Sequence, residues 1–452
     1  MQNADRDTIV ALGTASGEGA IGIVRLSGSQ AIEIADACFQ GRQTLSILPS
    51  RYLTYGCFVF GGQNLDEVLA TVMRAPHSYT GEDIVEFNCH GGPFLLRMVI
   101  GSLVKSGARL ALPGEFTKRA FLNGKLDLSQ AEAVSDMISA RSELGLQSAY
   151  FQLRGGLKKR FESMAENLRR SMMLLEVGLD FSEDVVINFN EINGPTKHAL
   201  SEIETLIATY SQGKIMREGV LVTLAGCPNV GKSSLLNRLL EEDRAIVTNI
   251  PGTTRDTIEE EIDLDGLSVT LVDTAGIRQT DDPIEQEGTR RSRQYVDRAG
   301  LVLFIVDGSQ PPTDDDLLLL SVESQKQGFL VLNKIDLHLH PSWKCVNCSM
   351  QRLHISAITG QGIPELKQTM RSTLLGKGER STEIVTRERH VIALREAKEG
   401  LTQALTSLHL GNPGELIAMD LRVALDALSE IIGETTSDDV LDCIFKSFCI
   451  GK

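Results

Sequence analysis

Basic residues are too few in this 452-residue chain to balance its acidic ones. Lys and Arg total 45 against 60 Asp and Glu, which gives a formal net charge of −15. Neutralisation of phosphates supplies most of the affinity of nucleic-acid-binding proteins, so this balance argues against binding of RNA by the whole molecular surface. If RNA is the substrate, a partner or a local patch must supply the positive charge.

Long apolar runs are also missing. The longest, Leu301 to Val306, is far too short to cross a bilayer and instead predicts a buried strand. The first seven residues are polar and contain no apolar signal core, so nothing in them directs export. We therefore expect a cytoplasmic globular protein, and its length allows roughly two to four domains.

Cysteine is sparse and scattered, which suits reduced thiols rather than a disulfide framework. One local group deserves comparison with a metal site, because His338, His340, Cys345 and Cys348 lie within eleven residues. A zinc knuckle is one interpretation, although the order of the ligands is unusual. A solvated insertion loop between two strands is the default expectation.

A glycine-rich segment is the most informative feature of the chain. Residues 226–233 read Gly-Cys-Pro-Asn-Val-Gly-Lys-Ser, between an apolar run at 220–225 and a helix-like segment at 234–240. This strand–loop–helix order is the context that a phosphate-binding P-loop requires. Backbone amides and the helix N-terminus attract phosphate, Lys232 would contact the β- and γ-phosphates, and Ser233 would bind Mg²⁺.

Two further motifs follow in the order expected of a nucleotide site. In Gly252-Thr-Thr-Arg-Asp, which lies in a polar loop, Thr254 is the candidate to complete the coordination of Mg²⁺. Asp273-Thr-Ala-Gly ends an apolar strand at 269–272. Asp273 can hold the metal through water, and the amide of Gly276 can sense the γ-phosphate.

The sequence Asn333-Lys-Ile-Asp ends a strand at 329–332 and predicts which base is bound. The carboxylate of Asp336 would accept the N1–H and the exocyclic amine of guanine. Adenine offers neither donor, and this kind of mismatch gives about 10⁴-fold discrimination. Ser356-Ala357 would then supply a backbone amide for the base carbonyl. The four motifs together predict GTP rather than ATP as the ligand.

The residue after Asp273-Thr-Ala-Gly is Ile277, where many small GTPases have a glutamine that orients the attacking water. An isoleucine cannot orient water by hydrogen bonding. Hydrolysis therefore needs another residue for this task, and the acidic segment 281–288 is the candidate. The alternative is that this segment is a solvated loop without a catalytic role.

The periodicity of apolar residues divides the chain into four parts. We expect an α/β domain at 1–122, a helical part at 123–218, a P-loop GTPase domain at 219–376 and a second helical part at 377–452. The fold class is thus α/β plus all-α, with the GTPase domain inserted into a helical domain.

Local patterns predict several elements at the N-terminal end. Strands are expected at 21–26, 51–60 and 83–87, and a helix is expected from Phe94 to Ser106, ending at Gly107. Ser129 and Glu132 have the spacing of a capping box at the start of the next helix.

Further motifs outside the P-loop domain carry a family resemblance. They are Thr80-Gly-Glu-Asp with His90-Gly-Gly-Pro, Pro113-Gly-Glu-Phe, the run Arg119 to Leu128, and the terminal Phe448-Cys-Ile-Gly-Lys. With them the chain closely resembles, from end to end, the bacterial tRNA-modifying GTPases known as MnmE or TrmE.

The resemblance implies a function. Such proteins form the carboxymethylaminomethyl group on the wobble uridine of certain tRNAs, using a folate one-carbon donor. They act as homodimers, with an FAD-binding partner of the MnmG/GidA type. That partner would carry the flavin and much of the surface for tRNA, which agrees with the acidic balance of this chain.

The resemblance also implies roles for residues around the GTP. Asn229 would ligate a K⁺ ion that acts where other GTPases use an arginine, with the remaining K⁺ ligands at Thr248, Ile250 and Thr253. Glu285 would position the attacking water, with Glu287 as its competitor. The catalytic residues would be Glu285, Lys232 and Asn229. The GTP-binding residues would be Asn229, Val230, Gly231, Lys232, Ser233, Ser234, Thr248, Asn249, Ile250, Pro251, Gly252, Thr253, Thr254, Asp273, Thr274, Ala275, Gly276, Asn333, Lys334, Asp336, Ser356, Ala357 and Ile358.

The implied folate site consists of Arg25, Glu86, Lys125 and Lys452. A carboxylate suits the paired donors of a pterin ring, and cations suit the glutamate tail. Two interpretations of Cys449 stay open: a redox or nucleophilic role, or a packed thiol in the C-terminal segment.

Two rival functions remain at this stage. One is a GTP-switched ribosome-assembly factor without modification chemistry, although such factors usually have a basic RNA-binding appendage and this chain ends in an acidic helical stretch. The other is a scaffold with an inactive nucleotide site, which the intact Lys232, Ser233, Thr254 and Asp273 disfavour.

Overall fold

The computed structural model describes residues 7–180, 189–243, 259–273, 295–322, 327–376 and 383–452. Two compact units make up the chain. The first unit consists of Met1–Ser135, Gln152–Ala199 and Glu396–Lys452, and the second of Asp136–Phe151 and Leu200–Arg395. The chain thus passes from the first unit into the second twice, at 136–151 and at 200–395, and returns to the first unit each time. The boundaries of the four parts expected from the sequence stay predictions.

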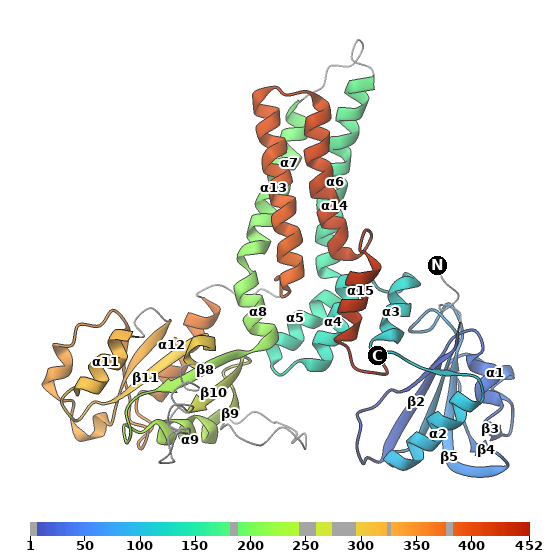
Figure 1. The fold of residues 1–452 in the computed structure, drawn as a ribbon, viewed down its shortest axis with the longest axis horizontal. Coiled ribbons are helices and arrows are strands. Elements are labelled where there is room, and N and C mark those ends of the chain that lie inside the picture. Colours follow the sequence, from blue (N-terminus) through green and yellow to red (C-terminus); the bar gives the residue numbers. More distant parts are fainter. Residues whose placement is uncertain (1–6, 181–188, 244–258, 274–294, 323–326, 377–382) are drawn as a thin grey trace, which may run out of the picture. The chain divides into compact units, whose positions relative to one another are not determined.

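The N-terminal part of the first unit is a mixed sheet covered by helices (Figure 1). Its seven strands have the order β3-β4-β5-β6-β2-β1-β7, antiparallel except for the last pair. The elements are β1 (Ile9–Leu12), β2 (Ile21–Ser27), α1 (Ala31–Asp36), β3 (Phe39–Gly41), η2 (Leu45–Ile47), β4 (Leu53–Phe60), β5 (Gln63–Met73), β6 (Ile84–His90), α2 (Pro93–Lys105), β7 (Arg109–Leu110) and α3 (Glu115–Leu122). The three strands and the helix predicted here are confirmed.

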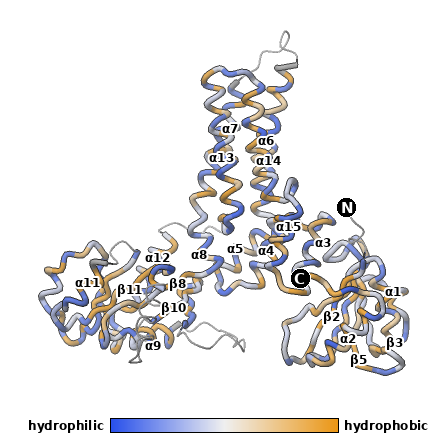
Figure 2. The backbone as a smooth tube through the Cα atoms, viewed as in Figure 1, coloured by the Kyte–Doolittle hydropathy of each residue, from blue (hydrophilic) through white to orange (hydrophobic). Residues whose placement is uncertain are grey.

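Helices follow the mixed sheet, and they return at the C-terminal end. They are α4 (Leu128–Ser139), α5 (Glu143–Leu153), α6 (Gly156–Asp180), α7 (Phe189–Ala208), α8 (Tyr210–Glu218), α13 (Glu388–Leu410), α14 (Gly414–Ile432) and α15 (Asp438–Lys446). Within the first unit α6 packs along α14. Figure 2 shows hydrophobic and hydrophilic residues alternating along these long helices, as expected where one face is buried. No helix in the described part of the chain is both long and apolar enough to cross a membrane.

The predicted capping box of α4 is wrong by two residues. Asp127 Oδ1 accepts hydrogen bonds from the Gln130 amide at 2.9 Å and the Ser129 hydroxyl at 2.6 Å. Gln130 Oε1 in return accepts from the Asp127 amide at 3.0 Å. The reciprocal pair is therefore Asp127 and Gln130, because the helix begins at Leu128 and its N-cap precedes Ser129.

The second unit contains a six-stranded sheet with the order β13-β12-β11-β8-β10-β9, in which only β9 runs antiparallel to its neighbour. This is the parallel nucleotide-binding sheet expected from the sequence. Its elements are β8 (Val220–Ala225), α9 (Lys232–Asp243), β9 (Glu259–Asp263), β10 (Ser268–Asp273), β11 (Leu301–Asp307), α11 (Asp314–Val322), β12 (Gly328–Asn333), η4 (Ile335–Leu337), η5 (Pro341–Lys344), β13 (Gln351–His354) and α12 (Ile363–Leu375).

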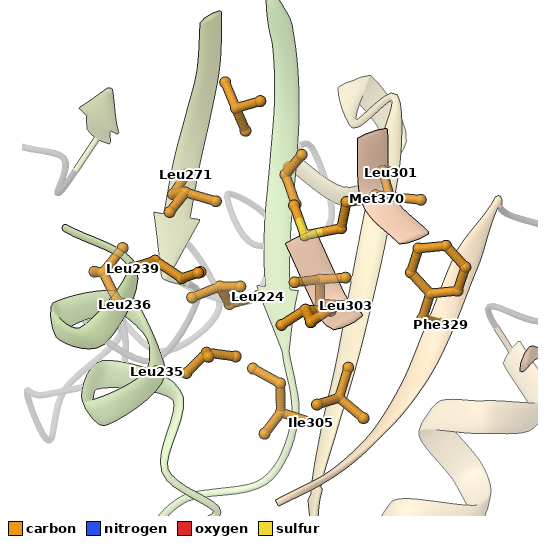
Figure 3. Close-up of a cluster of buried hydrophobic side chains, with 14 of the residues drawn as sticks. Leu224, Leu235, Leu236, Leu239, Leu271, Leu301, Leu303, Ile305, Phe329 and Met370 are labelled. Atoms are coloured by element: carbon orange, nitrogen blue, oxygen red, sulfur yellow. The ribbon is translucent and has the colours of Figure 1, made fainter. Parts of the chain in front are cut away.

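Strand β11 shows why its sequence is a continuous apolar run. Leu301, Leu303 and Ile305 face the core that α9 and α12 cover, where Figure 3 shows them with the α9 leucines and Met370. The alternate residues Val302, Phe304 and Val306 belong to a second core on the other face. A parallel strand that is buried on both faces must be apolar at every position.

The connection between β12 and β13, residues 338–350, differs from the solvated loop expected from the sequence. Trp343 in η5 is 1% exposed and packs in the core beside β11, with Leu339, Val346 and Cys348 partly buried around it. Burial of one large indole gives this connection a fixed position against the sheet. We call residues 338–350 the 338–350 segment.

Candidate functional site

The P-loop joins the end of β8 to the start of α9. Lys232 is the first residue of α9 and its side chain is 4% exposed. Its ammonium donates to the carbonyls of Gly226 at 2.8 Å and Cys227 at 2.7 Å. The positive charge is thus held inside the loop, at the helix N-terminus where the helix dipole also favours phosphate.

Two glycines of the P-loop are required by their surroundings. Gly226 has a φ of 155°, and a Cβ atom there would collide with the carbonyl of Ile305 in β11. Gly231 has a φ of 97°, and a Cβ atom there would collide with the side-chain amide of Asn333. Both conformations favour glycine, and both let the loop approach neighbouring strands closely.

Asn333 connects three loops of the site. Its side chain is buried, donates to the Val230 carbonyl at 2.9 Å and accepts from the Ala357 amide at 3.0 Å. The P-loop, the guanine motif and the Ser356-Ala357 turn are therefore fixed relative to one another by one amide group. Parallel strands end at the same edge of the sheet, which explains how motifs far apart in sequence meet here.

Ser233 and Asp273 lie together as the Mg²⁺ prediction requires. The Ser233 hydroxyl donates to Asp273 Oδ2 at 2.9 Å, and Asp273 is the last residue of β10. A hydroxyl and a carboxylate are oxygen ligands of the kind that Mg²⁺ prefers, so the pair fits the ion.

The predicted base-binding residues lie after β12 and β13. Asp336, in η4, is exposed and can therefore reach a ligand in solvent. Ser356 and Ala357 are buried, and the amide of Ala357 is held by Asn333. Ile358 is 71% exposed beside them. The residues predicted to bind the phosphates and those predicted to bind the base thus lie along the same edge of one sheet.

Cys227 introduces a thiol into the P-loop. Burial, followed by the neighbouring carboxylate of Asp316, raises the pKa of this thiol to about 11. The thiol is therefore protonated at neutral pH and adds no negative charge beside a phosphate.

The sequence reasoning missed Asp307. This residue ends β11, and its Oδ2 accepts from the Lys334 ammonium at 2.7 Å. Lys334 also donates to the Asn229 carbonyl at 2.8 Å. Burial alone would raise the pKa of Asp307, but hydrogen bonds from Lys334 and Ser309 outweigh it and lower that pKa. A polar residue directly after an apolar parallel strand was the signal that could have identified it.

Two of the residues predicted for folate meet in the N-terminal sheet. Arg25 in β2 is directly opposite Glu86 in β6, and its Nε donates to Glu86 Oε1 at 2.6 Å. The guanidinium also lies 5.8 Å from the centre of the Phe116 ring. Both charged side chains are 18% exposed, so the pair is partly shielded but still reachable.

The C-terminal tail approaches the end of β1, the strand that pairs with β2. Gly451 is buried, and its backbone lies so close to Leu12 and Gly13 that a Cβ atom would collide with the Leu12 carbonyl. Gly13 is in turn next to the guanidinium of Arg25. Lys452, the last residue, therefore follows a segment held near Arg25. Lys125 donates to the Pro76 carbonyl at 2.8 Å, and its side chain is exposed.

The four residues considered as zinc ligands do not form a metal-binding group. In the described part of the chain no three His, Cys, Asp or Glu side chains come together in a way that could hold an ion. His340 Nδ1 accepts from the Ser342 amide, and Cys345 is exposed.

Several predicted site residues lie outside the described residues. They are Thr248, Asn249, Ile250, Pro251, Gly252, Thr253, Thr254, Thr274, Ala275, Gly276, Ile277, Glu285 and Glu287.

Three features of the parallel sheet define the second unit as a P-loop GTPase. They are a P-loop at the end of β8, a serine–aspartate pair that fits Mg²⁺, and an Asn-Lys-x-Asp motif after β12. Comparison with known families shows which family of GTPases it resembles. Residues 8–125 match the family described as GTP-binding protein TrmE N-terminus, and residues 128–449 match the MnmE helical domain.

Known proteins agree with these matches over the whole chain. A protein of Syntrophus aciditrophicus named tRNA modification GTPase MnmE is 46% identical over 455 residues, covering 99% of this chain and 100% of the relative. The protein of that name from Moorella thermoacetica is 44% identical and covers 99% of both chains. This chain belongs to the MnmE family of tRNA modification GTPases.

Solved structures also resemble parts of the chain. The G domain of the T. maritima FeoB iron transporter is 28% identical with a TM-score of 0.26, covering 34% of this chain and 98% of that one. Aquifex aeolicus Era bound to GDP and AlF₄⁻ is 24% identical with a TM-score of 0.28, covering 41% of this chain and 67% of that one.

Proposed function

We propose that this chain is a K⁺-dependent GTPase that forms the carboxymethylaminomethyl group at C5 of the wobble uridine in tRNAs. It acts in the cytoplasm as a homodimer, together with an FAD-dependent partner of the MnmG/GidA type. The observation that carries the proposal is the full-length similarity to relatives named tRNA modification GTPases, which includes the N-terminal domain as well as the GTPase domain.

GTP is hydrolysed at the end of the parallel sheet. Lys232 would contact the β- and γ-phosphates, and Ser233, Thr254 and Asp273 would hold Mg²⁺. Mg²⁺ offsets the negative charge of the phosphates. Asp336 selects guanine by accepting its two donors. The close contact between Ser233 and Asp273 and the buried ammonium of Lys232 support this assignment.

K⁺ would be held by Asn229, Thr248, Ile250 and Thr253, of which Ile250 could offer only its backbone carbonyl. A fixed cation beside the phosphates offsets charge that develops in the transition state, and an arginine in this role accelerates hydrolysis by about 10³–10⁵-fold. Glu285 positions the attacking water, which Ile277 cannot do. The contact between Lys334 and the carbonyl of Asn229 supports a fixed position for the P-loop asparagine.

A tetrahydrofolate derivative is bound in the N-terminal domain by Arg25, Glu86, Lys125 and Lys452. The paired strands hold Arg25 and Glu86 together, and the tail that carries Lys452 lies near Arg25. A carboxylate and cations suit the pterin ring and the glutamate tail respectively. The domain arrangement 1–122, 123–218, 219–376 and 377–452 is part of the same proposal.

The proposal is tested by mass spectrometry of wobble uridines in tRNA from a strain that lacks this chain. We expect the carboxymethylaminomethyl group to be absent and to return when the wild-type chain is supplied. A Lys232→Ala chain should fail to restore it. Full retention of the modification in the deletion strain would contradict the proposal and favour a GTP-switched ribosome-assembly factor.

A further inference from the structure

Residues with positive φ angles cluster in the loops around the P-loop. Five described residues other than glycine have a positive φ, and three of them are Asn229 at 63°, Lys334 at 64° and His338 at 70°. This conformation is unfavourable for residues with a side chain, and it persists only where surrounding contacts fix it.

The ammonium of Lys334 connects two of them. It donates to the carbonyl of Asn229 at 2.8 Å and to Oδ2 of Asp307 at 2.7 Å. The other oxygen of Asp307 accepts from the amide of Ser309 at 2.9 Å and from its hydroxyl at 2.6 Å. Since both oxygens are engaged, the carboxylate cannot rotate away from Lys334.

Trp343 fixes the backbone that carries Asp307. Its indole N–H donates to the carbonyls of Gln310 at 2.8 Å and Asp307 at 3.2 Å. The amide of His340 donates to the Gly308 carbonyl at 2.8 Å, so the 338–350 segment donates three hydrogen bonds to this loop. A buried indole with a satisfied N–H is a rigid anchor.

We propose that Asp307 and Trp343 are positioning residues of the nucleotide site. Trp343 holds the loop after β11, Asp307 on that loop holds the ammonium of Lys334, and Lys334 holds the backbone of the P-loop at Asn229. The 338–350 segment therefore acts on the P-loop through Asp307 and Lys334. One consequence rests on the proposed function, in which the side chain of Asn229 ligates K⁺.

Two conservative substitutions in the full-length protein test this series of contacts. Asp307→Asn keeps the size and an acceptor for Ser309 but removes the charge that faces Lys334. Trp343→Phe keeps an aromatic ring in the core but removes the indole donor. We expect the Kd for GDP, measured by calorimetry, to rise about 10-fold for Asp307→Asn and about 5-fold for Trp343→Phe, as for loss of a charged and a neutral hydrogen bond.

Glu242→Gln is the matched control. Glu242 accepts from the Lys367 ammonium at 2.6 Å in the same unit, so this change also removes a carboxylate from a lysine. Its Kd for GDP should stay within about twofold of the wild-type value, because surface ion pairs contribute little. An equal loss in the control would contradict a specific role for Asp307.

A combined variant tests whether the two residues act in series. If Trp343 acts through Asp307, the double variant should bind GDP about as weakly as Asp307→Asn alone. Strictly additive losses, or an unchanged Kd in Asp307→Asn, would overturn the proposal.

Turnover separates positioning from general damage. At saturating GTP and K⁺ the kcat of Asp307→Asn should stay within about twofold, while the K⁺ concentration for half-maximal turnover rises about 10-fold. A fall in kcat with an unchanged Kd for GDP would overturn the proposal. Equal wild-type rates in K⁺ and Na⁺ would instead contradict the proposed role of Asn229, and the GDP measurements would then decide the positioning role independently.

Discussion

The nucleotide site and the Arg25–Glu86 pair show two ways in which a sequence can encode a site. At the nucleotide site, the P-loop, the run that begins at Asp273 and the run that begins at Asn333 each stand at the end of a parallel strand, namely β8, β10 and β12. In the N-terminal sheet, Arg25 and Glu86 are 61 residues apart and meet because two antiparallel strands pair in one register. The first kind of site is readable from local sequence, whereas the second depends on strand pairing.

The two sites also differ in how their polar side chains are held. Lys232 is buried and bonded to carbonyls of its own P-loop, and Asn333 is buried and bonded to backbone groups of two neighbouring loops. Arg25 and Glu86 bond to each other and remain partly exposed. We therefore expect substitutions at the nucleotide site to remove GTPase activity. Substitutions of Arg25 or Glu86 should only weaken the binding of folate.

The largest effect is expected from Lys232→Ala. Removal of the ammonium from the P-loop should lower kcat/KM for GTP by about 10³-fold, since preorganised charge at the phosphates is lost. Steady-state phosphate release measures this, and folate binding should not change. Lys367→Ala, which removes a surface lysine of the same unit, is the control. A fall of less than about tenfold for Lys232→Ala would contradict the assignment of Lys232.

A smaller effect is expected from Glu86→Gln. If the carboxylate accepts donors of a pterin ring, 5-formyltetrahydrofolate should bind about 10- to 100-fold more weakly, as for loss of charged hydrogen bonds. GTP turnover should be unchanged, which separates the two sites. Isothermal calorimetry measures the affinity, with Glu67→Gln on the exposed face of β5 as control. Equal folate affinity in Glu86→Gln would remove this residue from the proposed site.

The stability of the N-terminal domain should depend on acid through Glu115. Burial alone would raise the pKa of Glu115, but hydrogen bonds from Arg109, the Leu112 amide and Arg119 outweigh it and lower that pKa. Its contribution to stability is therefore complete above the ordinary carboxyl pKa, near 4.3, and is lost as pH falls through the lowered folded value.

Glu115→Gln should lower the free energy of unfolding by about 2 kcal/mol at pH 7, with the difference from wild type shrinking in acid below pH 4. Circular dichroism in urea follows the whole chain. Trp343, the single tryptophan, lies in the second unit, so its fluorescence should report no change. Glu18→Gln is the control, and a pH-independent difference would contradict the assigned cause.

The smallest expected difference is between the alkylation rates of two cysteines, Cys227 and Cys449. Because the pKa of the Cys227 thiol is raised to about 11, only about one molecule in 10³ carries the thiolate at pH 8. Cys449 in the C-terminal tail is exposed. Iodoacetamide followed by peptide mass spectrometry should label Cys449 at least about tenfold faster than Cys227. Faster labelling of Cys227 would show that its thiol is activated rather than suppressed.

The types of the secondary-structure elements and the residues of the candidate sites could be predicted from the sequence to different degrees. The strand at 301–306 and the helix after the P-loop were predicted from apolar pattern and confirmed, because both are encoded by adjacent residues. The cap of α4 was assigned to Ser129 instead of Asp127, because both residues offer a side-chain oxygen and only the first helical residue distinguishes them. The segment at 338–350, expected as a solvated loop, has many exposed residues but is anchored to the core by the buried Trp343, which no periodic pattern indicates.

Local sequence was enough to predict a phosphate-binding loop, candidate magnesium ligands and a guanine motif in a fixed order, since each motif consists of neighbouring residues. The fold was needed to show that Asp307 holds Lys334, that Trp343 fixes the loop of Asp307, and that Arg25 faces Glu86. These contacts join residues distant along the chain, and their register follows from strand pairing and core packing, which local sequence does not specify.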